Sequence, residues 1–383
     1  MISLVISALL VLATGVVTLA LGPASATAAT ASPGLPDVTI QTATVPMTNL
    51  ASSATNATAS CPSGTLVGGG AFVGKVPPST ATPTNGLKLN GTIPSDAAGN
   101  PVANGATTPS NWTAVGGFGG QSEAGDQVTA FAECATGGPT GTTVVVSAPV
   151  GITTEGNPPI KAIATCPSGT RLLAGGALGV PPSQPSFKPV ASYPSDATGN
   201  PVADGTTNPD SWSAYGSAGA ANSSDQVTAY AVCSTDPTIN VQVARVDASG
   251  PLAASTFTTV TAPCVADDRL LGGGVLTDEG LNVEPQQGLH LRGSYPSADT
   301  SGTPATTAAL NPTNWTGVVQ AGGAGVPTTV MTRVFAMCAQ PTTVVTPTPA
   351  PTDTPVPTPA PTDTPVPTPA PTHTPAPTPA PTH

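Results

Sequence analysis

The chain has 383 residues, of which only 9 are basic and 20 acidic, and its net charge at pH 7 is −11. It also contains 42 Gly and 47 Pro, which excludes a coiled coil or long-helix protein, since those classes need Leu, Glu and Lys in quantity. The scarcity of Lys and Arg argues against nucleic-acid binding, because neutralising phosphates requires clustered basic side chains.

The first predicted element is a secretory signal peptide at residues 1–28. An almost unbroken apolar stretch over residues 1–21 is followed by the helix-breaking Gly22-Pro23 and by an Ala-x-Ala cleavage context at Ala24. A retained membrane anchor is the alternative, because about 20 apolar residues can span a bilayer. We expect cleavage, and therefore an exported chain without membrane contact.

A set of landmarks then recurs three times in the same order, with a period of about 100 residues. Each repeat opens with a cysteine and a glycine run, continues with a Pro-x-x-Trp step, and closes with an alternating segment that ends in cysteine. The chain is therefore divided into a signal peptide, three β-repeats (called the first, second and third repeat below) and a stalk: residues 1–28, 36–137, 138–237, 238–340 and 341–383.

The closing segments alternate with period two, which is the pattern of a β-strand. In the first repeat Val128 and Ala132 share one face and Phe131 lies on the other, as expected of a strand packed on both sides. Further β-branched runs at 142–146 and 239–246 are separated from these strands by Gly, Pro, Asn and Ser clusters. We predict an all-β fold, either three tandem disulfide-closed β-sandwich modules or three β-prism-like blades around a pseudo-threefold axis.

Each repeat holds two cysteines that enclose most of its length. Many pairings are possible, but the symmetry of the repeats favours one bond within each. An exported chain reaches an oxidising compartment, and zinc would need closely spaced ligand pairs that the sequence lacks. Closing loops of this length contributes up to about 4 kcal/mol in the chain-entropy model. The expected disulfides are Cys61–Cys134, Cys166–Cys233 and Cys264–Cys338.

The three tryptophans are the most informative side chains, because the chain has only 3 Trp, 4 Tyr and 6 Phe. Each follows a Pro-containing turn that would deliver the ring into a strand, so we expect a core anchor. The alternative is a platform on which a sugar ring stacks. The candidate ligand-binding residues are therefore Trp112, Trp212 and Trp315.

Other residue patterns carry weaker chemical signals. The glycine run at Gly68 and its relatives lack the Gly-Lys-Ser/Thr of a phosphate loop and indicate close packing instead. Asp96 and Asp196 lie in Gly-rich loops that could hold calcium, but they are interpreted as turn residues. His290 has no equivalent in the other repeats, so no Ser–His–Asp set is expected. We predict no catalytic residue, no metal and no cofactor.

From residue 346 the chain becomes a Pro/Thr-rich decamer repeat. Proline at every second or third position removes hydrogen-bond donors and fixes φ, so neither helix nor sheet can form. We expect a disordered or polyproline-II stalk over residues 341–383, whose threonines suit O-glycosylation.

The run of Cys-Pro-x-Gly, Gly-Gly-Gly, Trp and Ala-x-Cys resembles a repeat of uncharacterised secreted bacterial proteins and, more distantly, C-terminal modules of pilus-tip and phage-tail adhesins. The resemblance covers about residues 36–340, and the third repeat departs from it where Val265 follows Cys264. The threefold order is also similar to the β-prism of vitelline-membrane outer-layer proteins. These resemblances imply a fold and an extracellular setting rather than a site.

Together these observations predict a non-enzymatic secreted or cell-surface protein with a structural or adhesive role in the bacterial envelope. Its expected partner is a cell-wall or extracellular glycan, or another envelope protein. The alternative is a carbohydrate-binding or carbohydrate-active extracellular protein that uses the three tryptophans. Solvent exposure of the indole rings separates the two, because a stacking platform must be accessible.

Overall fold

The computed structural model describes residues 34–47, 54–75, 86–118, 123–151, 160–181, 187–218, 224–278, 288–322, 329–341 and 368–369. The chain divides into two units, Met1–Thr342 and Thr343–His383. The expected signal peptide and nearly all of the expected stalk lie outside the described residues. Within the described residues the named elements are all β-strands, which confirms the all-β class, and no helix there is long and apolar enough to cross a membrane.

Within the described parts of the three repeats, nineteen strands follow one another along the chain. The strands of the first repeat are β1 (Asp37–Pro46), β2 (Ala54–Ser60), β3 (Thr65–Gly74), β4 (Leu87–Ser95), β5 (Asn111–Phe118) and β6 (Gln127–Thr136). Those of the second are β7 (Thr143–Val146), β8 (Val150–Gly151), β9 (Ile160–Thr165), β10 (Arg171–Val180), β11 (Phe187–Ser195), β12 (Ser211–Ala218) and β13 (Gln226–Ser234). Those of the third are β14 (Asn240–Ser249), β15 (Phe257–Pro263), β16 (Arg269–Asp278), β17 (Leu289–Ser297), β18 (Asn314–Ala321) and β19 (Met331–Gln340).

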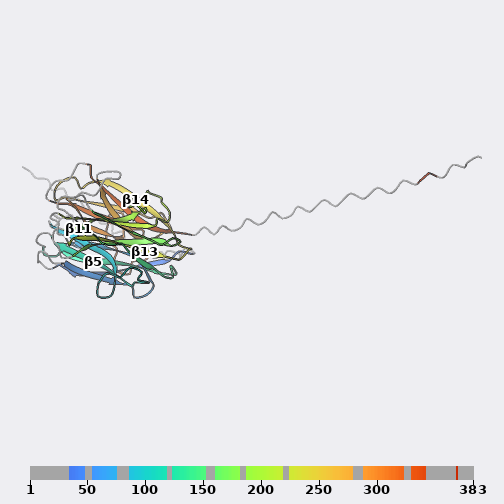
Figure 1. The fold of residues 1–383 in the computed structure, drawn as a ribbon, viewed down its shortest axis with the longest axis horizontal. Helices are drawn as coiled ribbons and strands as arrows, with labels where there is room; N and C mark the ends of the chain where they lie inside the picture. Colours follow the sequence, from blue (N-terminus) through green and yellow to red (C-terminus); the bar gives the residue numbers. More distant parts are fainter. Residues whose placement is uncertain are drawn as a thin grey trace, which may run out of the picture. The chain divides into compact units, whose positions relative to one another are not determined.

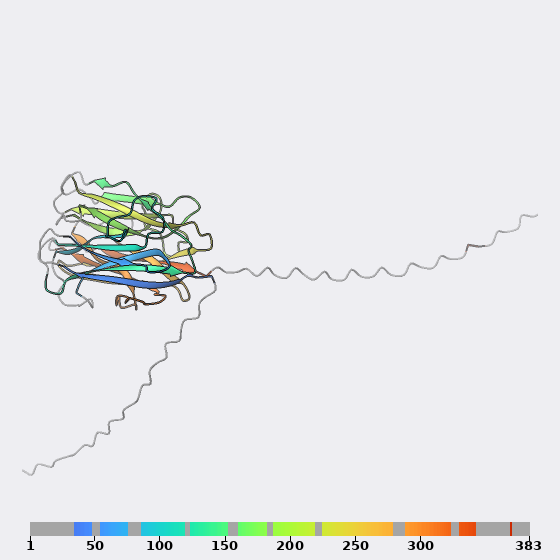
Figure 2. The same ribbon diagram turned by 90° about the horizontal axis from the view of Figure 1, so that it is seen from below.

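The strands form three sheets, and each sheet combines strands of two repeats. Sheet A has the order β1-β6-β3-β17-β18-β15, sheet B the order β2-β5-β4-β10-β13-β7 with β8 also pairing β13, and sheet C the order β14-β19-β16-β11-β12-β9. Figure 1 shows β5, β11, β13 and β14 in this body, and Figure 2 shows its strands as stacked layers. The third repeat completes the sheet that the first repeat begins, so the three repeats close into a ring.

The two arrangements left open by the sequence are both present in part. Each repeat contributes about half of the strands of two different sheets, and we call each such group a half-sheet. Within a repeat the two half-sheets pack face to face as in a sandwich, for example β3 on β4 and β1 on β2. The half-sheets do not end at the repeat boundary, however, because β3 pairs with β17, β4 with β10 and β11 with β16. An inner strand such as β3 would otherwise present an unpaired backbone edge, and the neighbouring repeat satisfies part of it.

The three disulfides join the sheets to one another. In each bond the first cysteine directly follows a strand of one half-sheet. The second cysteine lies in the central strand of the half-sheet packed on it. The three bonds therefore link sheet A to B, B to C and C to A. The pairs are those expected from the symmetry of the repeats: Cys61–Cys134, Cys166–Cys233 and Cys264–Cys338. They indicate an oxidising environment such as the cell exterior.

A loop of one repeat covers the outer edge of the first strand of the next repeat. In sheet A the Ile40 amide donates to the Ala309 carbonyl at 2.9 Å, and the Ala308 amide donates back to Ile40 at 2.8 Å. The Val144 amide donates to Ala106 at 2.8 Å and the Val243 amide to Thr206 at 2.9 Å in the equivalent places. The loop over β1 comes from the third repeat, so these bonds also help to close the ring.

Candidate functional site

The three tryptophans are completely buried, with 0% of each residue exposed. Their indole Nε1 atoms donate to hydroxyl oxygens at 2.8–3.0 Å, Trp112 to Thr92, Trp212 to Ser192 and Trp315 to Ser294. A Cβ added to Gly69, Gly175 or Gly273 would overlap these rings, which explains the glycine runs as surfaces on which an indole packs. The rings therefore serve as core anchors and present no face on which a sugar could stack.

The acidic loops are Asx turns. Asp96 Oδ1 accepts the backbone amides of Ala98 and Asn100 at 2.9 and 2.8 Å, and Oδ2 accepts the Asn100 side chain at 3.0 Å. Asp196 repeats the pattern, and the Thr198 hydroxyl that donates to it lowers the pKa of its carboxyl below the usual range. Among the described residues, no group of three or more His, Cys, Asp or Glu side chains is placed to hold a metal ion.

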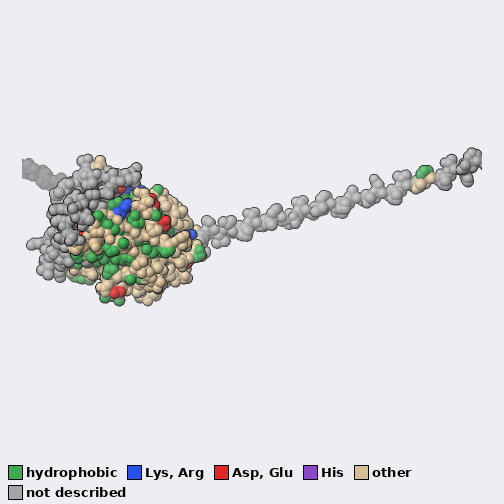
Figure 3. Space-filling view, viewed as in Figure 1, with side chains coloured by type: hydrophobic (Ala, Val, Ile, Leu, Met, Phe, Trp, Pro, Cys, Tyr) green, Lys and Arg blue, Asp and Glu red, His purple; other side chains and the backbone are tan. Residues whose placement is uncertain are grey.

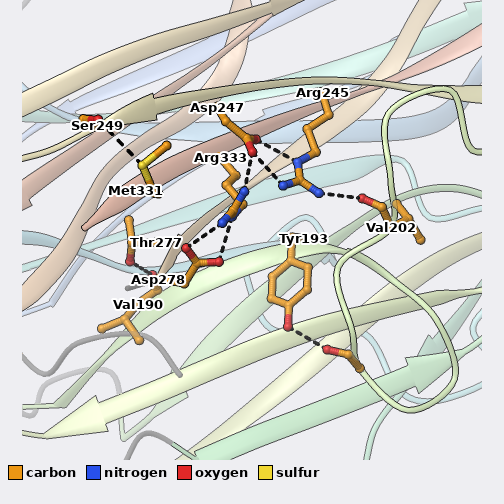
Figure 4. Close-up of polar contacts among 11 residues, drawn as sticks. Val190, Tyr193, Val202, Arg245, Asp247, Ser249, Thr277, Asp278, Met331 and Arg333 are labelled. Carbon is orange, nitrogen blue, oxygen red and sulfur yellow. Dashed lines mark hydrogen bonds and ion pairs between the residues drawn. The ribbon is translucent and has the colours of Figure 1, made fainter. Parts of the chain in front are cut away.

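An ion-pair network on sheet C was not foreseen from the sequence (Figure 4). Arg333 lies between two carboxylates, donating to Asp278 from Nε at 2.7 Å and from Nη2 at 3.1 Å and pairing with Asp247 through Nη1. Arg245 binds the same Asp247 through two bonds of 2.7 Å. Arg333 of β19 bridges carboxylates of β14 and β16 and so ties three neighbouring strands together, whereas Arg245 and Asp247 both belong to β14.

Glu133 of β6 is an acid in an apolar place. Its residue is 0% exposed, and neither carboxyl oxygen has a hydrogen-bond partner among the described residues. Burial raises the pKa of its carboxyl to about 8. A Cβ added to Gly68 of β3 or Gly272 of β16 would approach Glu133 Oε2. The two glycines therefore leave room for the carboxyl group. Glu133 was not singled out from the sequence. The available signal is Val232, which holds the equivalent place before the closing cysteine of the second repeat and indicates an apolar, buried position.

A cluster of basic side chains lies where β4, β11 and β17 begin. We call it the basic cluster, and its residues are Lys88, Lys188, His290 and Arg292. The Lys88 ammonium donates to the Phe187 carbonyl at 2.7 Å, and Arg292 Nε donates to Val73 at 3.2 Å. Only His290 was considered from the sequence, where the absence of an equivalent in the other repeats indicates an ordinary surface or strand residue. It does lie in a strand, β17, where it is buried.

The catalytic potential of these groups is small. Within the part of the chain that the structure describes, His290 Nε2 lies 3.2 Å from Gln320 Oε1, an amide oxygen, and no hydrogen bond joins it to an orienting acid. Neither a family model nor a curated protein matches the chain.

Proposed function

We propose that the protein is a non-enzymatic, secreted or cell-surface protein with a structural or adhesive role in the bacterial envelope. The observation that carries the proposal is the ring of three sheets, in which every pair of sheets is joined by a disulfide. Cross-links of this kind restrict the unfolded chain and persist outside the cell, where thiols are oxidised. The sequence of the leader and of the Pro/Thr stalk supports the same setting.

The way in which large side chains are used supports a structural role. The indole rings are in the core, and the repeated acids of the first two repeats are turn residues. Figure 3 shows a face on which Lys, Arg, Asp and Glu side chains are few and hydrophobic and neutral polar atoms prevail. The proposed partner of such a neutral surface is a cell-wall or extracellular glycan, or another envelope protein.

Fractionation of producing cells, followed by non-reducing peptide mapping, tests the setting. We expect the protein in the medium or the wall fraction with its three disulfides intact, and a reduced cytoplasmic protein would overturn the proposal. The mature protein should also co-sediment with purified cell wall or with particles coated with envelope proteins. It should release no reducing sugar from the wall. Release of sugar that scales with protein concentration would overturn the non-enzymatic part.

A further inference from the structure

The inner strands of three half-sheets converge, and each carries a basic residue at its second position. β4, β11 and β17 belong to three different sheets, yet each packs against the other two. The basic residues are Lys88, Lys188 and His290. Lys88 and His290 are buried, whereas Lys188 is partly exposed.

The positive charges of the cluster act on one another. Burial, together with the charges of Lys188, Arg292 and Lys88, lowers the pKa of His290 to about 3. Burial lowers the pKa of Lys88 to about 7, with Lys188 adding to the effect and Asp225 opposing it, and lowers the pKa of Lys188 to about 8. An anion among these groups would favour their charged forms and raise each pKa.

Two buried hydrogen-bond donors lie beside Lys188 and His290. Ser217 stands opposite Lys188 in the ladder of β11 and β12, and Gln320 stands opposite His290 in the ladder of β17 and β18. Residues directly opposite in an antiparallel pair have neighbouring side chains. The Ser217 hydroxyl and Gln320 Nε2 have no partner among the described residues, although buried polar groups nearly always have one.

Acidic groups lie on the flanks of the cluster. Asp225 acts on Lys88, while Asp126 and Glu123 act on Arg292. Glu123 Oε2 is also paired with Lys75 Nζ at 2.8 Å. The Gln320 Oε1 atom accepts Arg292 Nη1 at 2.6 Å, which leaves the amide nitrogen of Gln320 as the group available for a ligand.

We propose that Lys88, Lys188 and His290, together with the donors Ser217 and Gln320, form a binding site for a tetrahedral oxyanion. Strands of three repeats supply these donors. A tetrahedral ion such as phosphate or sulfate has three oxygens arranged around the bond to its fourth oxygen, so each strand would supply a donor to one of the three. Hydrogen bonds from charged donors to such oxygens are among the strong ones. The fourth oxygen would lie on the side of the partly exposed Lys188, so a free ion and a phosphate monoester share this chemistry.

Isothermal titration calorimetry on the mature full chain tests the proposal, with sulfate, inorganic phosphate and glycerol 3-phosphate as probes and chloride to hold the ionic strength constant. We expect saturable one-to-one binding at pH 6.5. Sulfate keeps its charge across this range, so its affinity should fall about tenfold or more at pH 9, where Lys88 and Lys188 have lost their protons. Binding of glycerol 3-phosphate as tightly as phosphate identifies a monoester as ligand, and binding of the inorganic ions alone identifies a free ion.

Variants locate the binding. Lys188→Met and Ser217→Ala should each weaken sulfate binding, Lys188→Met by about tenfold or more, which is the usual effect of losing a hydrogen bond to a charged group. Lys161→Met removes the same charge from β9, where Lys161 contacts the Thr198 carbonyl, and should leave the affinity unchanged. Absence of saturable binding, or an equal loss in Lys161→Met, would overturn the site. The proposed envelope role would then still stand, since fractionation tests it separately.

Discussion

Replacing Glu133 with methionine should stabilise the protein, and the gain should grow as the pH rises. The Glu133 side chain is buried without a hydrogen-bond partner among the described residues, and Met337 holds the equivalent place in the third repeat. Methionine therefore fits the position in volume and removes a polar group from an apolar setting. This variant is the most direct test of how the interior of the ring is built.

The magnitude follows from the pKa of the Glu133 carboxyl, which burial raises from 4.5 to about 8. Between these two pH values the folded protein keeps a proton that the unfolded chain has released, so the free energy of unfolding falls as the pH rises through this window. At about 1.4 kcal/mol per pKa unit the loss reaches about 5 kcal/mol at pH 8. At pH 4.5 only the neutral, unpartnered carboxyl is penalised, by about 1–3 kcal/mol.

The assay is guanidinium unfolding with disulfides intact at pH 4.5, 6, 7 and 8, for the wild type, Glu133→Met, Glu133→Gln and the exposed control Glu123→Gln. The pH dependence of the difference between variant and wild type is the relevant quantity. His290, with a pKa lowered to about 3, contributes in the opposite direction, because its share of stability is lost as the pH falls from about 6.5. Taking the difference cancels that contribution.

We expect the advantage of Glu133→Met to increase by about 5 kcal/mol from pH 4.5 to pH 8. Glu133→Gln should lose the pH dependence but remain less stable than Glu133→Met, because it keeps an unpartnered polar group. Glu123→Gln disturbs an exposed ion pair with Lys75 and a charge that acts on Arg292, and it should change stability by about 1 kcal/mol or less. A difference between Glu133→Met and the wild type that does not vary with pH would refute the reasoning.

Three further predictions concern the ring and the stalk. Replacing both Cys166 and Cys233 with alanine should lower the free energy of unfolding by about 4 kcal/mol in denaturant titrations, because the bond closes a loop with a sequence separation of 67. Gly68→Ala should cost about 1–3 kcal/mol by overpacking, because its Cβ would overlap a backbone carbonyl, whereas Ala174→Gly should cost less; equal effects would contradict the packing. Deleting residues 346–383 should leave the melting temperature unchanged, since they belong to a separate unit, and a drop of more than a few degrees would contradict it.

Much of the fold could be predicted from patterns that recur within single repeats. The cysteine spacing predicted the three disulfides, because a covalent bond between equivalent positions must obey the symmetry of the repeats. The period-two alternation around Phe131 predicted the strand β6. The scarcity of aromatic side chains favoured buried rings at Trp112 and its equivalents, as the structure shows.

The sharing of sheets between repeats could not be predicted, because it depends on few and distant pairings. β3 and β17 pair only at Phe72↔Gly293 and Ala71↔Ser294, and no local pattern specifies such a junction. The basic cluster was missed for a related reason. Lys88 and Lys188 each look like ordinary exposed strand residues, and only their equivalent positions in three converging strands bring them together.

Closure of the ring restricts how the gene can change. In an open array of repeats, units are gained or lost by recombination and the remaining units still stack. Here the half-sheet of the third repeat is completed only by the first, through pairs such as Phe72↔Gly293. A chain that lost one repeat would expose inner strand edges that invite pairing with another chain. The copy number of three is therefore part of the fold.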